Sequence, residues 1–277
     1  MTPEQCSSWV SDAVGAGLTG LGLGGIRPEE WEIQKAIRLR FHGQIEIFTS
    51  FGWHPWECQN LALRAEAEGI EPVIESCVRR LESEILHAHA IGETGLDLSR
   101  RFNQQEVEIQ QLLFVAQLSL ALTHHKPLVL HVVNAHTQAH ALMRDGLNRD
   151  GHARYSGIIH SFSGTTAEAL TYVDLGFLIS IGPSILRKGF GSLKAAVVGL
   201  DTKHLVFETD APDQAGRAKT LVKGGRSSDY SVGDFASSQV LLEVVAEVTR
   251  LKGLVATVDQ VLGDASERFL CTMNRLG

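Results

Sequence analysis

Four side chains of the kind that bind metal ions end or follow short apolar segments of the sequence. Glu93 ends the segment 89–93, His131 ends 127–131, and His160 ends 157–160. Asp210 comes directly after the segment 205–209. Two imidazoles and two carboxylates are a ligand set that Zn²⁺, Mn²⁺ or Mg²⁺ accepts, and such ions make hydroxide from water near neutral pH. The pattern therefore predicts a metal site suited to hydrolysis.

The apolar segments themselves predict the elements that carry these residues. Helical spacing of apolar residues over 70–85 and 103–123 alternates with short apolar runs, which is typical of βα units in a parallel sheet. In parallel α/β barrels the active site lies at the C-terminal ends of the strands, and a closed barrel has eight of them. We predict a TIM-type (β/α) barrel with seven recognisable strands and no recognisable first strand. The seven lie near 18–23, 45–51, 89–93, 127–131, 157–161, 177–181 and 204–208.

Size and composition favour one enzyme-sized domain over residues 1–277. The 277 residues are 44% hydrophobic, enough for a single large core. The net charge of -7 argues against a broad basic surface for duplex DNA. Four scattered cysteines without zinc-type spacing predict reduced thiols. No run approaches the roughly 18 apolar residues of a membrane span, so we expect no membrane contact and a cytoplasmic location.

Six short motifs follow one another along the chain. They are Phe-Gly-Trp-His-Pro at 51–55, Ala-Ile-Gly-Glu-Thr-Gly-Leu-Asp at 90–97, Lys-Pro-Leu-Val-Leu-His at 126–131, Ile-His-Ser-Phe-Ser-Gly at 159–164, Ile-Gly-Pro at 181–183 and Glu-Thr-Asp-Ala-Pro at 208–212. In this order and spacing the sequence resembles the TatD family of metal-dependent deoxyribonucleases, within the amidohydrolase-like TIM barrels. The resemblance runs from about residue 5 to the C-terminus.

The resemblance implies a metal site with divided roles. Glu93 would be shared between two metals, and His131 and His160 would bind one of them. Asp210 would bind the other and steer the attacking water, so Asp210 and Glu93 are the expected catalytic residues. One or two divalent ions per chain, Zn, Mg or Mn, are the expected cofactors.

Two further residues have roles that the sequence leaves open. His54 is similar to the family histidine that faces the substrate phosphate, and the alternative is a turn imidazole packed between Trp53 and Trp56. Asp97 could orient a metal ligand or cap the next segment, and we favour orientation.

The chain departs from the family pattern in three places. The His-x-His pair of the family's first strand is not recognisable, and His89 cannot replace it because four residues of strand, roughly 13 Å, separate it from Glu93. Val133 stands where the family has an arginine, which removes a phosphate contact. The family's Asn-x-Pro is not evident near 234–238. Arg100 and Arg101 could meet a phosphate, although a solvated charge pair is the favoured interpretation.

The resemblance implies hydrolysis of phosphodiester bonds, with DNA as the expected substrate and a metal-activated water as the nucleophile. The polar segment 213–234 is expected to be a long loop near the site, better suited to a single strand than to a duplex. One alternative is a degenerate relative that holds one metal or none and acts as a binding or assembly component. Another keeps the barrel and metal but hydrolyses a different ester or amide. We also expect another segment, an upstream extension or a partner chain to cover the open barrel edge.

Overall fold

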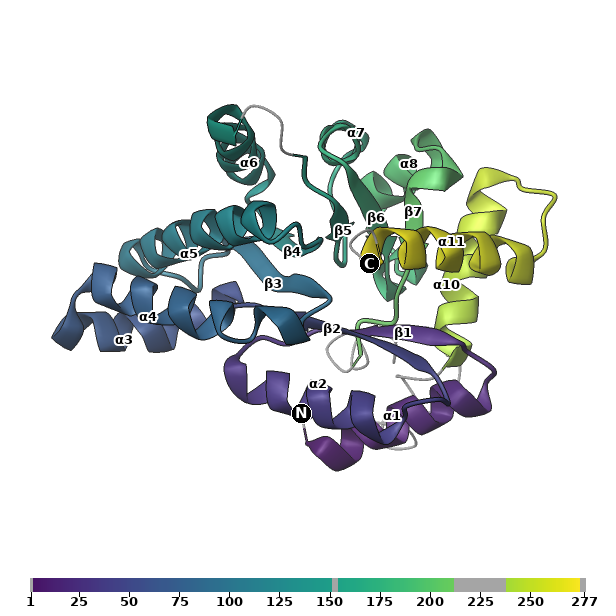
Figure 1. Cartoon of the computed structure of the whole chain (residues 1–277). Coiled ribbons are helices and arrows are strands. Elements are labelled where there is room, and N and C mark those ends of the chain that lie inside the picture. The colour runs from purple at the N-terminus through teal and green to yellow at the C-terminus, as the bar shows by residue number, and fades with distance from the viewer. Residues whose placement is uncertain (1, 151–153, 212–237, 275–277) are drawn as a thin grey trace, which may run out of the picture.

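The computed structural model describes residues 2–150, 154–211 and 238–274. Seven strands form one sheet in the order in which they occur in the chain, and every neighbouring pair is parallel. They are β1 (Gly20–Leu23), β2 (Glu46–Phe51), β3 (Ala90–Asp97), β4 (Leu128–Val133), β5 (Gly157–Ile159), β6 (Phe177–Ile181) and β7 (Leu205–Phe207). Figure 1 shows the sheet curling, with helices around its outside. The predicted TIM-type architecture with seven strands is confirmed, and β1 and β7 are the two edges of the sheet among the described residues.

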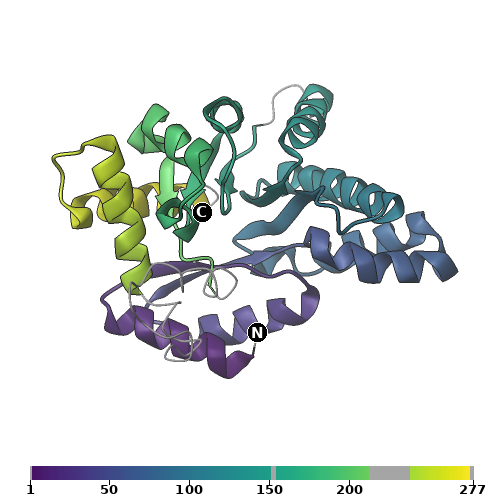
Figure 2. The same ribbon diagram turned by 180° about the vertical axis from the view of Figure 1, so that it is seen from behind.

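Ten α-helices of the described part connect or follow the strands. They are α1 (Pro3–Gly15), α2 (Pro28–Arg40), α3 (Cys58–Glu68), α4 (Ile70–Glu82), α5 (Gln104–Thr123), α6 (His136–Asp150), α7 (Thr166–Asp174), α8 (Gly191–Gly199), α10 (Ser238–Lys252) and α11 (Val258–Met273). Seen from behind in Figure 2, α3, α4 and α5 lie on one side of the strands and α10 on the other.

Side-chain caps explain where several of these helices begin. Thr2, Asn103, Thr165 and Thr257 each accept a hydrogen bond from the backbone N–H three residues on, and the residue there bonds back to the cap. Such a cap stabilises a helix by about 1 kcal/mol. Thr2 and Thr257 therefore mark where α1 and α11 begin.

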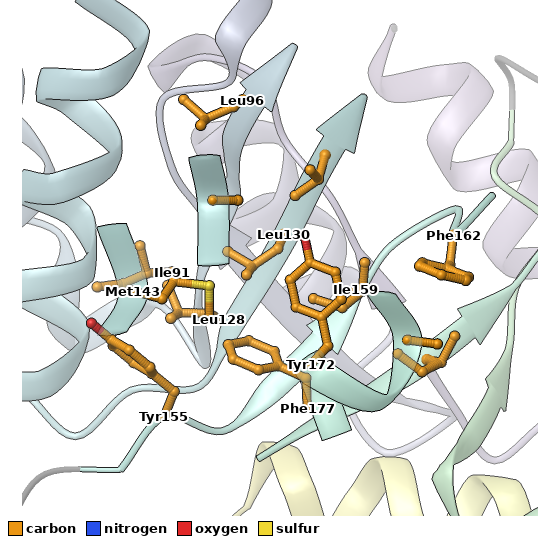
Figure 3. Packing of buried hydrophobic residues seen from close by; sticks show 14 of the residues in the cluster. Ile91, Leu96, Leu128, Leu130, Met143, Tyr155, Ile159, Phe162, Tyr172 and Phe177 are labelled. Carbon is orange, nitrogen blue, oxygen red and sulfur yellow. The ribbon is translucent and has the colours of Figure 1, made fainter. Parts of the chain in front are cut away.

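The main core lies between the strands and the outer helices. Figure 3 shows part of it, where Leu128 and Leu130 of β4 and Ile159 of β5 meet Tyr172 of α7 and Phe177 of β6. All five side chains are buried. Because a parallel sheet with helical cover buries its strands, these runs are apolar almost throughout.

A separate apolar cluster closes one end of the curled sheet. It takes one residue from each of β2 to β7 and packs them against α11; the strand residues are Phe48, Ala90, Val129, Ile158, Leu178 and Val206. The helix contributes Phe269, Leu270 and Met273. The C-terminal helix therefore fills this end, and the metal-type residues lie at the C-terminal ends of the strands.

Two details differ from or complete the sequence predictions. β3 does not end at Glu93 but continues to Asp97, pairing Gly95, Leu96 and Asp97 with β4 after a register shift. The four cysteines are free thiols, as predicted. Among the described residues, no helix has the length and apolar character of a membrane span.

Candidate metal centre

The loop after β1 holds both His54 and Glu93 by backbone hydrogen bonds. The N–H of His54 donates to the carbonyl of Ile26 at 3.2 Å, and the N–H of Glu93 donates to the carbonyl of Gly25 at 3.1 Å. At Gly24 a side-chain carbon would collide with Oε1 of Glu93. A glycine at this position therefore leaves the space that the Glu93 carboxylate occupies.

His54 is buried and its ring has a defined tautomer. Its side chain is only 2% exposed, and its Nδ1 accepts a hydrogen bond from the backbone N–H of Trp56 at 3.0 Å. Burial, followed by the neighbouring His131 and His160, lowers the pKa of His54 well below its usual value, so the ring is neutral. In a neutral ring that accepts at Nδ1, the proton is on Nε2. His54 therefore presents an N–H donor, and its Nε2 lies 3.7 Å from Oε2 of Glu93.

Glu93 joins two groups of possible metal ligands. One group is His54, Glu93 and His131, and the other is His160, Glu208 and Asp210. Oε2 of Glu93 also lies 3.7 Å from Nε2 of His160. The same Nε2 is 3.2 Å from Oδ1 of Asp210. The four residues predicted from the sequence are therefore gathered in one pocket.

Glu208 orients the ring of His160. Its carboxylate lies 3.1 Å from Nδ1 of His160 and accepts hydrogen bonds from the hydroxyl of Ser180 and the backbone N–H of Ser161, both at 2.6 Å. With Nδ1 bonded to Glu208, Nε2 of His160 faces Glu93 and Asp210, and it would offer its lone pair to a cation once it releases its proton. A carboxylate behind a histidine is the usual support of a metal-binding imidazole.

His131 lies between His54 and Asp97. Its ring centroid is 4.4 Å from that of His54, and its Nε2 is buried without a hydrogen-bond partner among the described residues. Oδ2 of Asp97 is 3.9 Å from that Nε2, too far for a hydrogen bond. Asp97 instead accepts from Trp56 Nε1 at 3.2 Å and from the Ser99 N–H at 2.9 Å. Asp97 thus caps the turn at Ser99 and also lies beside His131, an expected metal ligand.

Several residues just after the strands have left-handed backbone conformations. Asn134 follows β4 with φ of 53°, Ser161 follows His160 with φ of 47°, and Asp210 has φ of 52°. Non-glycine residues seldom adopt this region, and where they do the cost is often tied to a functional site. At Asp210 this conformation places the carboxylate beside His160.

The charges of the pocket suit a cation. Burial raises the pKa of the Glu93 carboxyl despite the opposing effect of His160 and His131. Burial alone would lower the pKa of His160, but Glu208, Glu93 and Asp210 raise it well above its usual value. In the free protein the pocket therefore retains protons, and a bound cation would replace their positive charge. The unpartnered Nε2 of His131 and the oriented Nε2 of His160 fit such an ion.

The structure separates the sequence candidates into those inside the pocket and those outside. Glu93, His131, His160, Asp210 and His54 are brought together, and His54 packs against Trp56 and His131. His89 is outside, because it contacts Phe48 and its Nδ1 accepts from the Thr49 N–H. The segment 213–234 and most of 234–238 lie outside the described residues.

Glu208 is the residue that sequence reasoning missed. In the sequence it belongs to the motif at 208–212, where only Asp210 has an expected role. The available signal was its spacing from Asp210, because residues two apart point to the same side of an extended chain.

A barrel of parallel strands with imidazoles and carboxylates at their C-terminal ends defines a class of metal-dependent hydrolases. The family model described as TatD related DNase matches residues 5–270. The chain belongs to the TatD family and is a metal-dependent hydrolase of that family.

Curated relatives and solved structures agree with this assignment. The Edwardsiella piscicida protein named 3'-5' ssDNA/RNA exonuclease TatD is 31% identical over 204 residues, which cover 73% of this chain and 72% of that protein. A Mycobacterium tuberculosis protein named uncharacterized metal-dependent hydrolase TatD is 35% identical over 214 residues, covering 76% and 74%. The alignment with the Escherichia coli hydrolase YjjV, 33% identical, spans 60% of this chain and 59% of that protein.

The solved structures confirm the fold. The crystal structure of YjjV from Escherichia coli matches with a TM-score of 0.71 at 23% identity, covering 99% of this chain and 92% of that one. A TatD family hydrolase from Entamoeba histolytica matches with a TM-score of 0.72 at 18% identity, covering 97% and 89%.

Proposed function

We propose that this chain hydrolyses phosphodiester bonds in nucleic acid, with single-stranded DNA as the expected substrate. The single observation that carries the proposal is the pocket in which Glu93, His131, His160 and Asp210 meet beside the N–H donor of His54. The printed name of the Edwardsiella piscicida relative, an exonuclease of single-stranded DNA and RNA, supports the substrate class.

In this proposal the four metal-type residues hold one or two divalent cations. Glu93 lies between the two ligand groups, and Asp210 lies beside His160. When bound, such a cation neutralises phosphate oxygens and lowers the pKa of water. Zn²⁺, Mg²⁺ and Mn²⁺ are all compatible with nitrogen and carboxylate donors.

The protein's own side chains do the rest of the chemistry. Asp210 accepts a proton from the attacking water or orients that water. His54 donates a hydrogen bond from its Nε2–H to a phosphate oxygen, since its Nδ1 already accepts from the Trp56 N–H. Glu208 keeps the ring of His160 in one tautomer, so the ring does not turn when the substrate arrives.

Digestion of oligonucleotides tests this function. Single-stranded and duplex DNA oligonucleotides and a single-stranded RNA are incubated with the chain and Mg²⁺ or Mn²⁺, with EDTA as the blank. We expect metal-dependent cleavage that favours single strands and falls at least a hundredfold in Asp210→Asn. His42→Ala, which changes an exposed histidine, is the matched control and should retain activity.

Two results would contradict the proposal. The absence of metal-dependent cleavage of every nucleic acid would remove the nuclease function, and a panel of other esters and amides would then identify the substrate. Elemental analysis of the purified chain supplies the metal count, and a chain that binds no metal would favour a binding or assembly role.

A further inference from the structure

Trp56 forms one wall beside the candidate metal centre. It lies in the turn Pro55–Glu57 directly after His54, and its ring centroid is 4.9 Å from that of His54 and 6.0 Å from that of His131. Its Nε1 donates to Oδ2 of Asp97 at 3.2 Å. The indole is therefore fixed next to the place where a substrate phosphate would meet His54.

Arg101 lies over this indole. The guanidinium carbon is 4.3 Å from the centroid of the Trp56 ring and 4.7 Å from that of Phe102. Its Nη2 is 3.5 Å from Oδ2 of Asp97. These contacts hold a long side chain whose position on the surface would otherwise be variable.

The guanidinium keeps its capacity to bind an anion. The side chain of Arg101 is 45% exposed, and its guanidinium makes no hydrogen bond to the described residues, only the longer contact with Asp97. Arginine has five N–H donors in a planar fork that matches a phosphate. The contact with the buried Asp97 engages only Nη2 of the guanidinium, at 3.5 Å, so the other N–H groups can still meet a phosphate.

The neighbouring arginine lacks the ring contacts and the ion pair that hold Arg101. Arg100 is exposed and has no ring contact, ion pair or hydrogen bond among the described residues. Val133, the position expected to carry a phosphate-binding arginine in the family, has an apolar side chain. Arg101 follows β3, the strand whose Asp97 pairs with Val133 of β4.

We propose that Arg101, held by Trp56, binds the phosphate of the nucleotide next to the one that is cleaved. The chain would then select oligonucleotides over diesters that contain a single phosphate. This inference rests on the proposed nuclease function and adds a specificity-determining residue to it.

A selectivity ratio tests the inference. The quantity is kcat/KM for a single-stranded DNA oligonucleotide divided by kcat/KM for bis(p-nitrophenyl) phosphate, which has one phosphate only. We expect Arg101→Ala to lower this ratio about tenfold and to reduce the slope of log KM against log salt by about 0.7, the value for one single-strand phosphate contact. Arg101→Lys should recover part of the ratio, because it keeps the charge without the planar fork. Arg100→Ala is the matched control and should change the ratio less than twofold.

The outcomes separate the inference from the function on which it rests. If the wild-type chain cleaves oligonucleotides but Arg101→Ala and Arg100→Ala have the same ratio and salt slope, the inference is wrong and the nuclease function stands. An equal loss on both substrates would also overturn it, because Arg101 would then act on the metal centre itself. A wild-type chain that cleaves neither substrate would overturn both proposals.

Discussion

At the scale of single residues, the Glu208 carboxylate orients His160, one of the expected metal ligands. Its two oxygens receive the Ser180 hydroxyl, the Ser161 N–H and His160 Nδ1 within 3.1 Å. All its short contacts are therefore with donors that belong to the protein. This arrangement fixes both the direction and the tautomer of His160.

Glu208→Gln tests this positioning role. The amide keeps the size of the side chain but loses the negative charge. Its NH₂ group cannot accept hydrogen bonds, so at least one donor among Ser180, Ser161 and His160 loses its acceptor. We expect the affinity for Mn²⁺ to fall between about tenfold and a hundredfold, as measured by isothermal titration calorimetry. Glu82→Gln on the exposed surface of α4 is the control. Unchanged affinity in Glu208→Gln would show that His160 needs no support from this carboxylate.

At the scale of elements, the loop after β1 decides where the Glu93 carboxylate can lie. The carbonyl oxygens of Gly25 and Ile26 accept from the backbone N–H groups of Glu93 in β3 and of His54 in the connection after β2. Gly24 stands directly against the tip of the Glu93 side chain. The loop after the edge strand β1 therefore determines the position of the Glu93 side chain in β3.

Gly24→Ala should move the Glu93 carboxylate with little effect on folding. The new methyl group would meet Oε1 of Glu93, the far end of a flexible side chain, so the side chain can turn away at small cost. We expect at least a tenfold loss of metal affinity and of nuclease activity, with a melting temperature within a few degrees of wild type. Gly15→Ala is the matched control, because nothing lies within 4 Å of its added carbon. Full metal affinity in Gly24→Ala would contradict the argument.

The sequence predicted elements better than it predicted contacts. The helix predicted from the apolar spacing over 103–123 depends on neighbours along the chain, and it is confirmed as α5. The end of β3 was placed wrongly at Glu93, because its polar residues resemble a strand end although β4 pairs with them as far as Asp97. The stacking of Arg101 on Trp56 joins residues of two connections, and no local pattern in the sequence encodes that approach.

At the scale of the whole molecule, one end of the curled sheet is packed with apolar side chains and the other carries the candidate metal ligands. Phe269 of α11 packs edge-on against Phe48 of β2. Its ring lies so close to Gly22 of β1 that a Cβ added there would be 3.1 Å from it, so apolar side chains fill this end. The other end carries the metal-type residues. The expectation that a further segment or partner chain covers the edges at β1 and β7 stays a prediction, to be tested by the mass of the native protein in solution.

Partly buried histidines outside the metal centre make the fold sensitive to acid. Burial lowers the pKa of His89 to about 4 and that of His140 to about 4, and it also lowers the pKa of His136. In the unfolded chain these rings have pKa values of about 6.5. Between pH 6.5 and 4 the unfolded state therefore binds more protons than the folded state, and the free energy of unfolding decreases as the pH falls through this window.

His89→Gln isolates one of these histidines. The amide oxygen can accept from the Thr49 N–H, as Nδ1 does at 3.0 Å, but it does not take up a proton. The ring is only partly buried, so we expect the stability lost between pH 7 and pH 4.5 to be about 1 to 2 kcal/mol smaller in the variant than in wild type. Urea unfolding at both pH values, with EDTA present to remove metal effects, gives this difference. His42→Gln, at an exposed position, should lose as much stability as wild type. An equal loss in His89→Gln would place the acid sensitivity elsewhere in the molecule, with His140 the next residue to replace.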